Sequence, residues 1–322
     1  MKAAVVTQTG VEIREVPAPV PGRNHVLVRV RACGLNRADL GVAAGHMHGS
    51  TGGPGTIVGM EFAGEVVEVG AEVSAVKPGD RVMCSGAGAF AEYAVADWGR
   101  ATPIPANMRF DQAATLPVAL QTMHNALVTA GRLAAGESVL IQGASSGVGL
   151  MALQIAKHMG AALVMGTSTN AMRREKLKQF GADLAIDTTD PAWPDAVLAA
   201  TEGKGVHLII DQVSASVANA NMKAARVLGR IVNVGRLGGA KGEFDYDLHA
   251  LKRIDYIGVT FRTRSIEEVR EINRRMRADL WGAIEAGTLR LPLDRSFPLA
   301  EAAAALAHMR ANAHFGKIVL SA

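Results

Sequence analysis

The segment GASSGVG, residues 143–149, combines small side chains with a position where a phosphate ligand could bind. A pyrophosphate binds backbone N–H groups at the N-terminus of a helix, and a larger side chain in that turn would hold the ligand away. An apolar strand-like run at about 138–142 precedes the segment, a helical pattern follows at about 148–158, and a second strand is expected at about 162–166. This βαβ arrangement predicts a dinucleotide site, with a plain tight turn as the alternative. The candidate contacts are Gly143, Ala144, Ser146, Gly147, Val148 and Gly149.

The end of the second expected strand indicates which dinucleotide binds. An NAD site usually places a carboxylate there for the ribose 2′-hydroxyl, and that carboxylate would repel a 2′-phosphate. No acid occurs after this strand until Glu175, while nearby hydroxyl and guanidinium groups could bind a phosphate. We therefore predict NADPH, although the basic residues could instead form the solvated face of the next helix. The candidate contacts are Thr167, Ser168, Thr169, Arg173 and Arg174.

The segment RACGLNRADL, residues 31–40, places a cysteine, an asparagine and an aspartate beside a glycine turn, where a metal could bind. Cys33, His46, His48 and Glu61 are side chains of the right kind, but none of them has a ligand spacing such as C-x-x-C. A catalytic zinc needs three protein ligands. We therefore expect no metal site and interpret Cys33 as a small buried residue at a strand end.

Composition limits the classes of protein to consider. The chain has 322 residues, 49% of them apolar, which is enough material for two globular domains. Its 34 basic and 30 acidic residues give a formal charge of +4, and the basic residues are spread along the chain, so we expect no nucleic-acid partner. Two cysteines provide no disulfide framework, and charges and glycines interrupt every apolar stretch that could cross a membrane. The first residues, MKAAVVTQTG, have neither the apolar region nor the cleavage site expected of a signal peptide. We expect a cytoplasmic protein.

The hydrophobic pattern of the sequence changes along the chain. Residues 1–100 contain short alternating apolar runs separated by turns, which is an all-β pattern. From 137 onward, apolar runs at 207–213, 229–235 and 254–260 are separated by helical segments and extend the βαβ unit into a doubly wound parallel sheet. A charged amphipathic helix and a last strand, GKIVLSA, follow 262.

The order of several motifs resembles the medium-chain dehydrogenases/reductases, in particular their zinc-independent quinone oxidoreductase branch. The resemblance rests on segments along nearly the whole chain: CGLNRADL (33–40), GMEFAGEVVEVG (59–70), VKPGDRV (76–82), VLIQGASSGVGLMALQIAK (139–157) and FGKIVL (315–320). It implies an α/β protein in which a GroES-like, β-barrel-type catalytic domain (1–122 and 262–322) surrounds a Rossmann dinucleotide-binding domain (123–261). It also implies an active site in the cleft between the domains, and a homodimer formed through the Rossmann domains.

The resemblance also implies roles for single residues. The zinc ligands of the zinc-dependent relatives fall on Asn36, Met60 and near Val118, none of which is a usual zinc ligand. Asn36 would lie beside the nicotinamide as a catalytic polar group, or its amide would only close an Asx-type turn, and Asp39 would brace that turn. Lys317 would close over the cofactor, or it would be an exposed strand charge. The further cofactor contacts implied are Thr122, Gly235, Arg236, Leu237, Gly316 and Lys317.

Without a metal to stabilise an alkoxide, alcohol oxidation is disfavoured and hydride addition to an electron-poor carbon is favoured. We therefore predict an NADPH-dependent reductase of quinones or of α,β-unsaturated carbonyls. An NADP-dependent carbonyl or alcohol oxidoreductase and a non-catalytic cofactor-binding protein are the alternatives. Enoyl reductases of this branch often carry a tyrosine near 46–47, and here His46, Met47 and His48 stand instead, so either histidine is a candidate proton donor.

Overall fold

The computed structural model describes residues 1–322 and separates into two compact units. The first unit contains Met1–Gln121 and Phe261–Ala322, and the second contains Thr122–Thr260. The two ends of the chain therefore belong to the same unit, since the last strand, β15 (Lys317–Ser321), pairs antiparallel with β3 (His25–Gly34). No helix is both long enough and apolar enough to span a membrane.

A six-stranded sheet in which every neighbouring pair is parallel forms the centre of the second unit. Its spatial order is β10-β9-β8-β11-β12-β13, so the chain builds one half outward from β8 and the other half outward from β11. This is the strand order of dinucleotide-binding sheets, which bind their ligand at the carboxyl ends of the strands where the order reverses. The predicted doubly wound sheet is confirmed. The strands are β8 (Ser138–Ile141), β9 (Leu163–Thr167), β10 (Leu184–Ile186), β11 (Val206–Asp211), β12 (Ala225–Asn233) and β13 (Asp255–Gly258).

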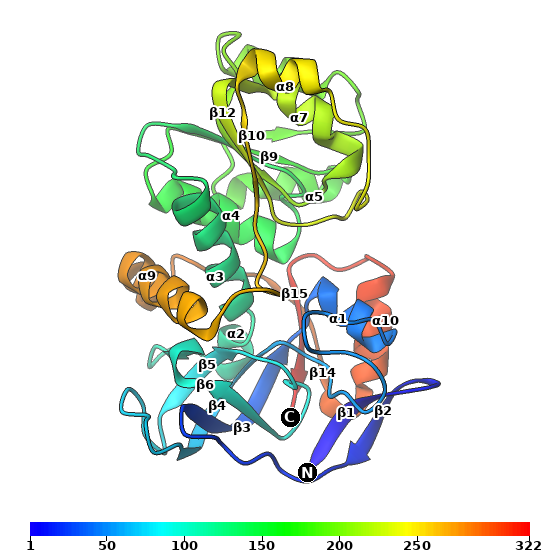
Figure 1. Ribbon diagram of the computed structural model, residues 1–322, viewed down its shortest axis with the longest axis vertical. Helices are drawn as coiled ribbons and strands as arrows, with labels where there is room; N and C mark the ends of the chain where they lie inside the picture. The colour runs from blue at the N-terminus through cyan, green and yellow to red at the C-terminus, as the bar shows by residue number, and fades with distance from the viewer. The chain divides into compact units, whose positions relative to one another are not determined.

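Helices cover this sheet, which explains why its strands are apolar on both faces. Helix α4 packs on β8 and β9, whereas α7 and α8 pack on β12 (Figure 1). Leu140, Ile209 and Ile231, on three neighbouring strands, are fully buried. The helical segments are α3 (Pro117–His124, which crosses the unit boundary), the π-helix η2 (Asn125–Ala130), α4 (Gly147–His158), α5 (Ala171–Lys176), η3 (Leu177–Phe180), α6 (Trp193–Ala200), η4 (Ala215–Val217), α7 (Ala218–Ala224) and α8 (Tyr246–Lys252).

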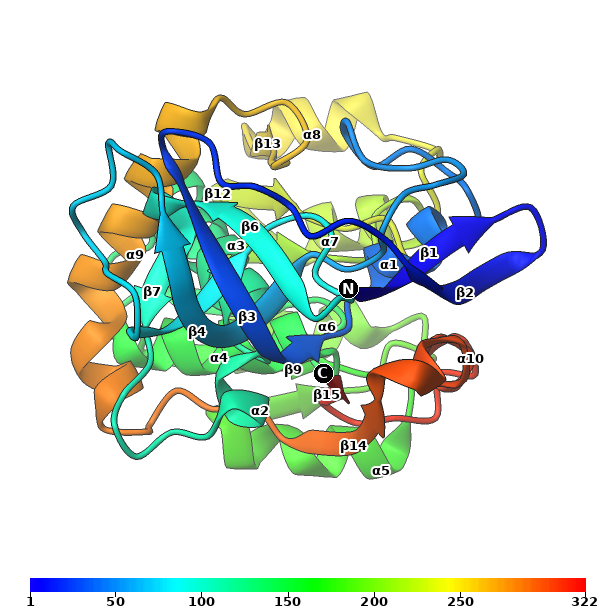
Figure 2. The same cartoon turned by 90° about the horizontal axis from the view of Figure 1, so that it is seen from below.

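The first unit contains a seven-stranded, mostly antiparallel sheet. Its path is β14-β15-β3-β4-β5-β7, with β6 also paired to β3, and only β14 and β15 run parallel. The β1–β2 pair forms a separate hairpin (Figure 2). The remaining strands are β1 (Lys2–Thr7), β2 (Gly10–Glu15), β4 (Glu61–Val69), β5 (Arg81–Ser85), β6 (Tyr93–Asp97), β7 (Ala101–Pro103) and β14 (Leu293–Pro298).

Short helices connect these strands, and one long helix packs against the short helix that joins β6 to β7. The predicted amphipathic helix is α9 (Ile266–Glu285), which begins where Ser265 Oγ accepts the Glu268 N–H group. It buries Val269, Ile272, Met276 and Leu280 on one face. The other helices of this unit are α1 (Arg37–Ala43), η1 (Trp98–Arg100), α2 (Phe110–Ala113), η5 (Leu299–Glu301) and α10 (Ala302–Arg310).

Candidate functional site

The turn between β8 and α4 presents unused hydrogen-bond donors at the N-terminus of the helix. Ser146 is the N-cap residue, and its Oγ accepts the Gly149 N–H group at 3.0 Å. The backbone N–H groups of Ser145, Gly147 and Val148 make no hydrogen bond within the chain. Three such donors at the positive end of a helix dipole fit a pyrophosphate.

Close packing explains the small residues of this turn. A Cβ atom on Gly149 would lie 2.6 Å from the Gly143 carbonyl oxygen and 2.7 Å from the Ala144 Cα atom. Gly143 has φ +67°, which favours glycine. On β9, a Cβ atom on Gly166 would lie 2.9 Å from the Ala144 Cβ atom. Gly143, Gly149 and Gly166 therefore allow the turn to lie against the two strands, and only small side chains fit there.

Polar side chains beneath the turn hold it in place. Thr167 Oγ1 donates to Gln142 Oε1 at 2.8 Å and accepts the Gly143 N–H group at 3.0 Å. Gln212 Nε2 donates to the Gln142 carbonyl oxygen, and its Oε1 accepts from Ser146 Oγ, both at 3.0 Å. Because Thr167 is only 1% exposed, its hydroxyl braces the turn. Sequence reasoning missed Gln142 and Gln212, since nothing in their local context marks them as partners.

The end of β9 carries the residues predicted for the 2′-phosphate. Ser168 is buried and Thr169 is exposed, while Arg173 and Arg174 are half-buried on α5. Arg174 donates to the Ser168 carbonyl oxygen at 2.9 Å and forms a 3.0 Å ion pair with Asp187. Hydrogen bonds from Thr189, with a contribution from Arg174, lower the pKa of Asp187, so this carboxylate is charged. Asp187 was not predicted here, because it follows β10, the strand next to β9, and stands well beyond Glu175 in the sequence.

The loop after β12 lies at the same carboxyl edge of the sheet. A Cβ atom on Gly235 would lie 2.6 Å from the Gln212 carbonyl oxygen, so the loop approaches the end of β11 closely. Arg236 and Leu237 are exposed, the latter by 55%. Thr122, at the start of the second unit, is half-buried. The second unit therefore gathers the turn, the loop and the Arg174 region at the carboxyl edge of one sheet.

In the first unit, the structure joins Asn36 to two buried charged residues. Asn36 Nδ2 donates to Glu61 Oε1 at 2.8 Å, and Lys317 Nζ donates to Asn36 Oδ1 at 3.0 Å. Lys317 also pairs with Glu61 and donates to the Leu35 carbonyl oxygen at 2.7 Å. Glu61 is 0% and Lys317 is 5% exposed. Lys317 is therefore not an exposed strand charge, and its ammonium hydrogens are committed to acceptors of its own unit.

Glycines and a backbone amide complete this cluster. Glu61 Oε2 accepts the Val118 N–H group at 2.8 Å. A Cβ atom on Gly34 would lie 2.6 Å from Glu61 Oε1. Gly316 has φ +92°, and a Cβ atom there would lie 2.2 Å from the Pro292 carbonyl oxygen, which accounts for the glycine before Lys317.

Asp39 lies at the start of α1 and is fully buried. Its Oδ2 accepts the Asn36 N–H group at 2.7 Å, so Asp39 braces the turn as predicted, while Oδ1 has no partner. Desolvation raises the pKa of Asp39 to about 7, opposed by the Asn36 hydrogen bond and the Lys317 charge, and Glu61 raises it further. The turn is thus closed by Asp39, and the Asn36 side chain points to Glu61 and Lys317.

The residues considered for a metal are not assembled into a site. No group of three or more His, Cys, Asp or Glu residues is placed to hold a metal ion. Cys33 is fully buried, its Sγ donates to the Ala89 carbonyl oxygen at 2.8 Å, and burial raises the pKa of its thiol. His46 is exposed. Burial, assisted by Arg262, lowers the pKa of His48, which makes it a poor proton donor at neutral pH.

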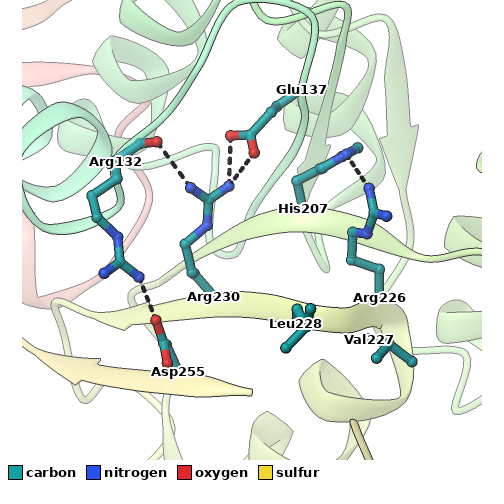
Figure 3. A pocket seen from close by; sticks show the side chains of 8 residues that line it. All are labelled: Arg132, Glu137, His207, Arg226, Val227, Leu228, Arg230 and Asp255. Atoms are coloured by element: carbon teal, nitrogen blue, oxygen red, sulfur yellow. Dashed lines mark hydrogen bonds and ion pairs between the residues drawn. The ribbon is translucent and has the colours of Figure 1, made fainter. Parts of the chain in front are cut away.

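A hollow of about 330 Å³ in the second unit lies at the opposite edge of the sheet. Figure 3 shows its charged walls, which come from the segment between η2 and β8 and from the starts of β11, β12 and β13. Arg230 contacts both carboxylate oxygens of Glu137 at 2.5 Å, Arg132 pairs with Asp255, and Arg226 contacts His207. Because ligands of such sheets bind at the carboxyl ends, we interpret this hollow as a charge network that joins strand starts.

Comparisons with known proteins agree with this architecture. The alcohol dehydrogenase GroES-like domain model matches residues 22–106, and the zinc-binding dehydrogenase model matches 147–277. Quinone oxidoreductase of Rattus norvegicus is 31% identical over 309 residues, which cover 95% of this chain and 92% of the relative. The chain belongs to the medium-chain dehydrogenase/reductase superfamily, in its quinone oxidoreductase-like group.

Two further proteins are similar to most of this chain. The structure of mycobacterial Rv1454c complexed with NADPH superposes with a TM-score of 0.88 at 26% identity and covers all of both chains. A part of the polyketide synthase GfsB of Streptomyces halstedii is 34% identical over 92% of this chain, which spans only 5% of that protein. The zinc-binding dehydrogenase model matches 147–277, and the places where zinc ligands were expected, Asn36, Met60 and near Val118, lie outside that range.

Proposed function

We propose that this chain is an NADPH-dependent, zinc-independent reductase of quinones or α,β-unsaturated carbonyls. The observation that carries the proposal is the β8–α4 turn, where Ser145, Gly147 and Val148 offer unused N–H groups to a pyrophosphate. The arginines of α5 lie at the end of β9, where a 2′-phosphate would require positive charge. NADPH bound to Rv1454c and the quinone oxidoreductase relative support the same assignment.

When bound, NADPH supplies a hydride, so the overall reaction is NADPH, one proton and a quinone giving NADP⁺ and a hydroquinone. For an enone, the hydride and the proton saturate the carbon–carbon double bond. The second unit would hold the cofactor through the β8–α4 turn, the arginines of α5 and the loop carrying Gly235, Arg236 and Leu237. The first unit would contribute Asn36 as a polar group toward the reacting molecule, with solvent supplying the proton.

The donor set argues for this reaction class over alcohol oxidation. Oxidation of an alcohol requires stabilisation of an alkoxide, and a catalytic zinc does this with three protein ligands. Hydride addition to a quinone or an enone instead places negative charge on an oxygen that a hydrogen-bond donor can stabilise. The Asn36 amide is such a donor. The polyketide synthase relative supports keeping the enone within the substrate class, beside the quinone.

The decisive measurement is substrate-dependent NADPH oxidation with a panel of small quinones and cyclic or acyclic enones. We expect turnover with at least one of these classes. Alcohol-dependent reduction of NADP⁺ without quinone or enone turnover would favour the alcohol oxidoreductase alternative. Tight NADPH binding without any turnover would favour a non-catalytic cofactor-binding protein.

A further inference from the structure

The side-chain amide of Asn36 is held at both of its ends. Its Oδ1 accepts from the Lys317 ammonium at 3.0 Å, and its Nδ2 donates to Glu61 Oε1 at 2.8 Å. An ammonium can only donate and an ionised carboxylate can only accept, so these partners permit one orientation of the amide. A flipped amide would place its NH₂ group against the ammonium and its oxygen against the carboxylate. The Glu61–Lys317 pair therefore fixes which side of Asn36 is the donor.

One hydrogen of this amide remains available. The Nδ2 group carries two hydrogens, Glu61 takes one, and the other makes no hydrogen bond within the chain. Asn36 itself is half-buried, whereas Glu61 and Lys317 are almost completely buried. Within the cluster, the amide is thus the group that can reach a ligand.

Lys317 cannot act on a ligand directly. Its three ammonium hydrogens have three acceptors, the Leu35 carbonyl oxygen, Asn36 Oδ1 and Glu61 Oε1. Burying a charged pair is costly and is commonly no better for stability than packed apolar residues. A role in orienting Asn36 gives a functional reason for the buried charges.

We propose that Asn36 donates its free Nδ2 hydrogen to the carbonyl oxygen of the substrate that receives the hydride, and that Glu61 and Lys317 are positioning residues that fix this donor. The proposal rests on the proposed function and assigns the buried pair a role in it. Negative charge develops on that oxygen during hydride addition, so a fixed donor stabilises the transition state more than the ground state.

The variants are chosen to release the Asn36 amide from its fixed orientation without leaving an unpaired buried charge. Lys317→Met alone would strand the Glu61 carboxylate, so the test uses the double variant Glu61→Gln with Lys317→Met. Asn36→Ala removes the donor itself. The matched control is Asp97→Asn with Arg270→Met, which removes another pair with a buried carboxylate from the first unit, joined at 2.7 Å.

We expect kcat with the best quinone or enone to fall at least about tenfold in Asn36→Ala and in the double variant, with little change in the NADPH dissociation constant. The control should keep its activity. Because the pair acts through Asn36, the triple variant should be no slower than Asn36→Ala alone. If the losses in kcat of Asn36→Ala and of the double variant multiplied in the triple variant, the positioning role would be overturned. Full activity of Asn36→Ala would overturn the donor role.

A second readout does not depend on turnover. In perdeuterated protein, the Asn36 Nδ2 signals, assigned through the Asn36→Ala variant, report whether the amide holds one orientation. We expect sharp wild-type signals whose shifts differ from those of a solvated asparagine amide, because the carboxylate of Glu61 and the ammonium of Lys317 hold it, and we expect signals closer to the solvated values, or broadened, in the double variant. Unchanged signals in a folded double variant would overturn the positioning role. If no quinone or enone turns over, the proposed function fails while this measurement still decides the orientation.

Discussion

Residues that act within one short segment could be predicted from the sequence, whereas contacts between residues far apart in the chain could not. The β8–α4 turn could be predicted because glycine and small side chains stand next to one another in the sequence. The cluster of Asn36, Glu61 and Lys317 could not, because 256 residues separate Glu61 from Lys317 and only the β15–β3 pairing brings the last strand beside the first unit's early strands. Asn36 and Lys317 were each predicted as site residues, but their contacts with each other and with Glu61 were not.

Asp39 provides a prediction about pH and stability. Its pKa is raised to about 7 in the folded chain, mainly by desolvation, so folding favours the protonated form. The stability that Asp39 contributes is complete below its unfolded pKa of about 4 and is lost as the pH rises toward 7. The loss has a maximum slope of about 1.4 kcal/mol per pH unit.

The variant Asp39→Asn keeps an acceptor for the Asn36 N–H group and cannot ionise. We expect its free energy of unfolding, relative to the wild type, to increase between pH 4 and 7 and then to level off. Urea titrations at a series of pH values measure this difference. Parallel pH curves for the two proteins would show that Asp39 is not held protonated.

Arg174 and Asp187 provide a prediction about cofactor choice. If Arg174 binds the 2′-phosphate, Arg174→Ala should weaken the binding of NADPH about tenfold or more, because one charge-assisted hydrogen bond is lost. The binding of NADH should be nearly unchanged. The Asp187 carboxylate lies 3.0 Å from the Arg174 guanidinium and competes for it, so Asp187→Asn should tighten the binding of NADPH. Fluorescence titration with both cofactors measures these effects. Equal losses for NADPH and NADH would mean that Arg174 does not bind the phosphate, and Arg173→Ala is then the variant to compare.

At the scale of elements, the hydrophobic periods predicted the parallel sheet well because its strands are buried on both faces. The start of β12 at Ala225 was missed because its pairing with β11 is interrupted between Ala225 and Arg230, where Val227 and Leu228 are exposed. In the first unit, the segments carrying Asn36 and Val118 meet at Glu61, which follows Met60 in the chain. Glu61 joins them through the Asn36 amide and the Val118 N–H group, with Lys317 as the neighbouring cation.

Because Asn36, Met60 and Val118 are not zinc ligands and Lys317 already pairs with Glu61, we predict that protein purified without a metal-binding tag contains no stoichiometric zinc. Elemental analysis by mass spectrometry measures the metal content per chain, and added zinc should leave quinone or enone turnover unchanged. One zinc per chain that resists dialysis against a chelator would contradict the prediction. The Lys317 ammonium supplies the positive charge beside Glu61, so a divalent ion would have to displace it.

At the scale of the whole molecule, the sheet of the second unit ends in an open strand. β13 lies at the edge of the sheet, paired only with β12, and its Asp255 and Gly258 are exposed. The sequence predicted a strand over 254–260, and the observed strand is shorter. An unpaired edge offers N–H and C=O groups to another chain, and two copies of it can pair across a two-fold axis. We propose that the protein forms a homodimer through β13.

The register of β13 identifies the substitution that tests this dimer. The Val259 N–H group donates to the Asn233 carbonyl oxygen of β12, so the N–H groups of Tyr256 and Gly258 face away from the sheet. Proline at Gly258 would remove an outward donor without breaking the β12–β13 ladder, and a Cβ atom at Gly258 meets nothing within 4 Å. Gly258→Ala is the matched control, because it adds the Cβ atom and keeps the donor.

Light scattering at low micromolar concentration should give about twice the chain mass for the wild type and the alanine variant, and the chain mass for a folded Gly258→Pro variant. A monomeric wild type, or a proline variant that remains dimeric, would show that β13 is not the interface.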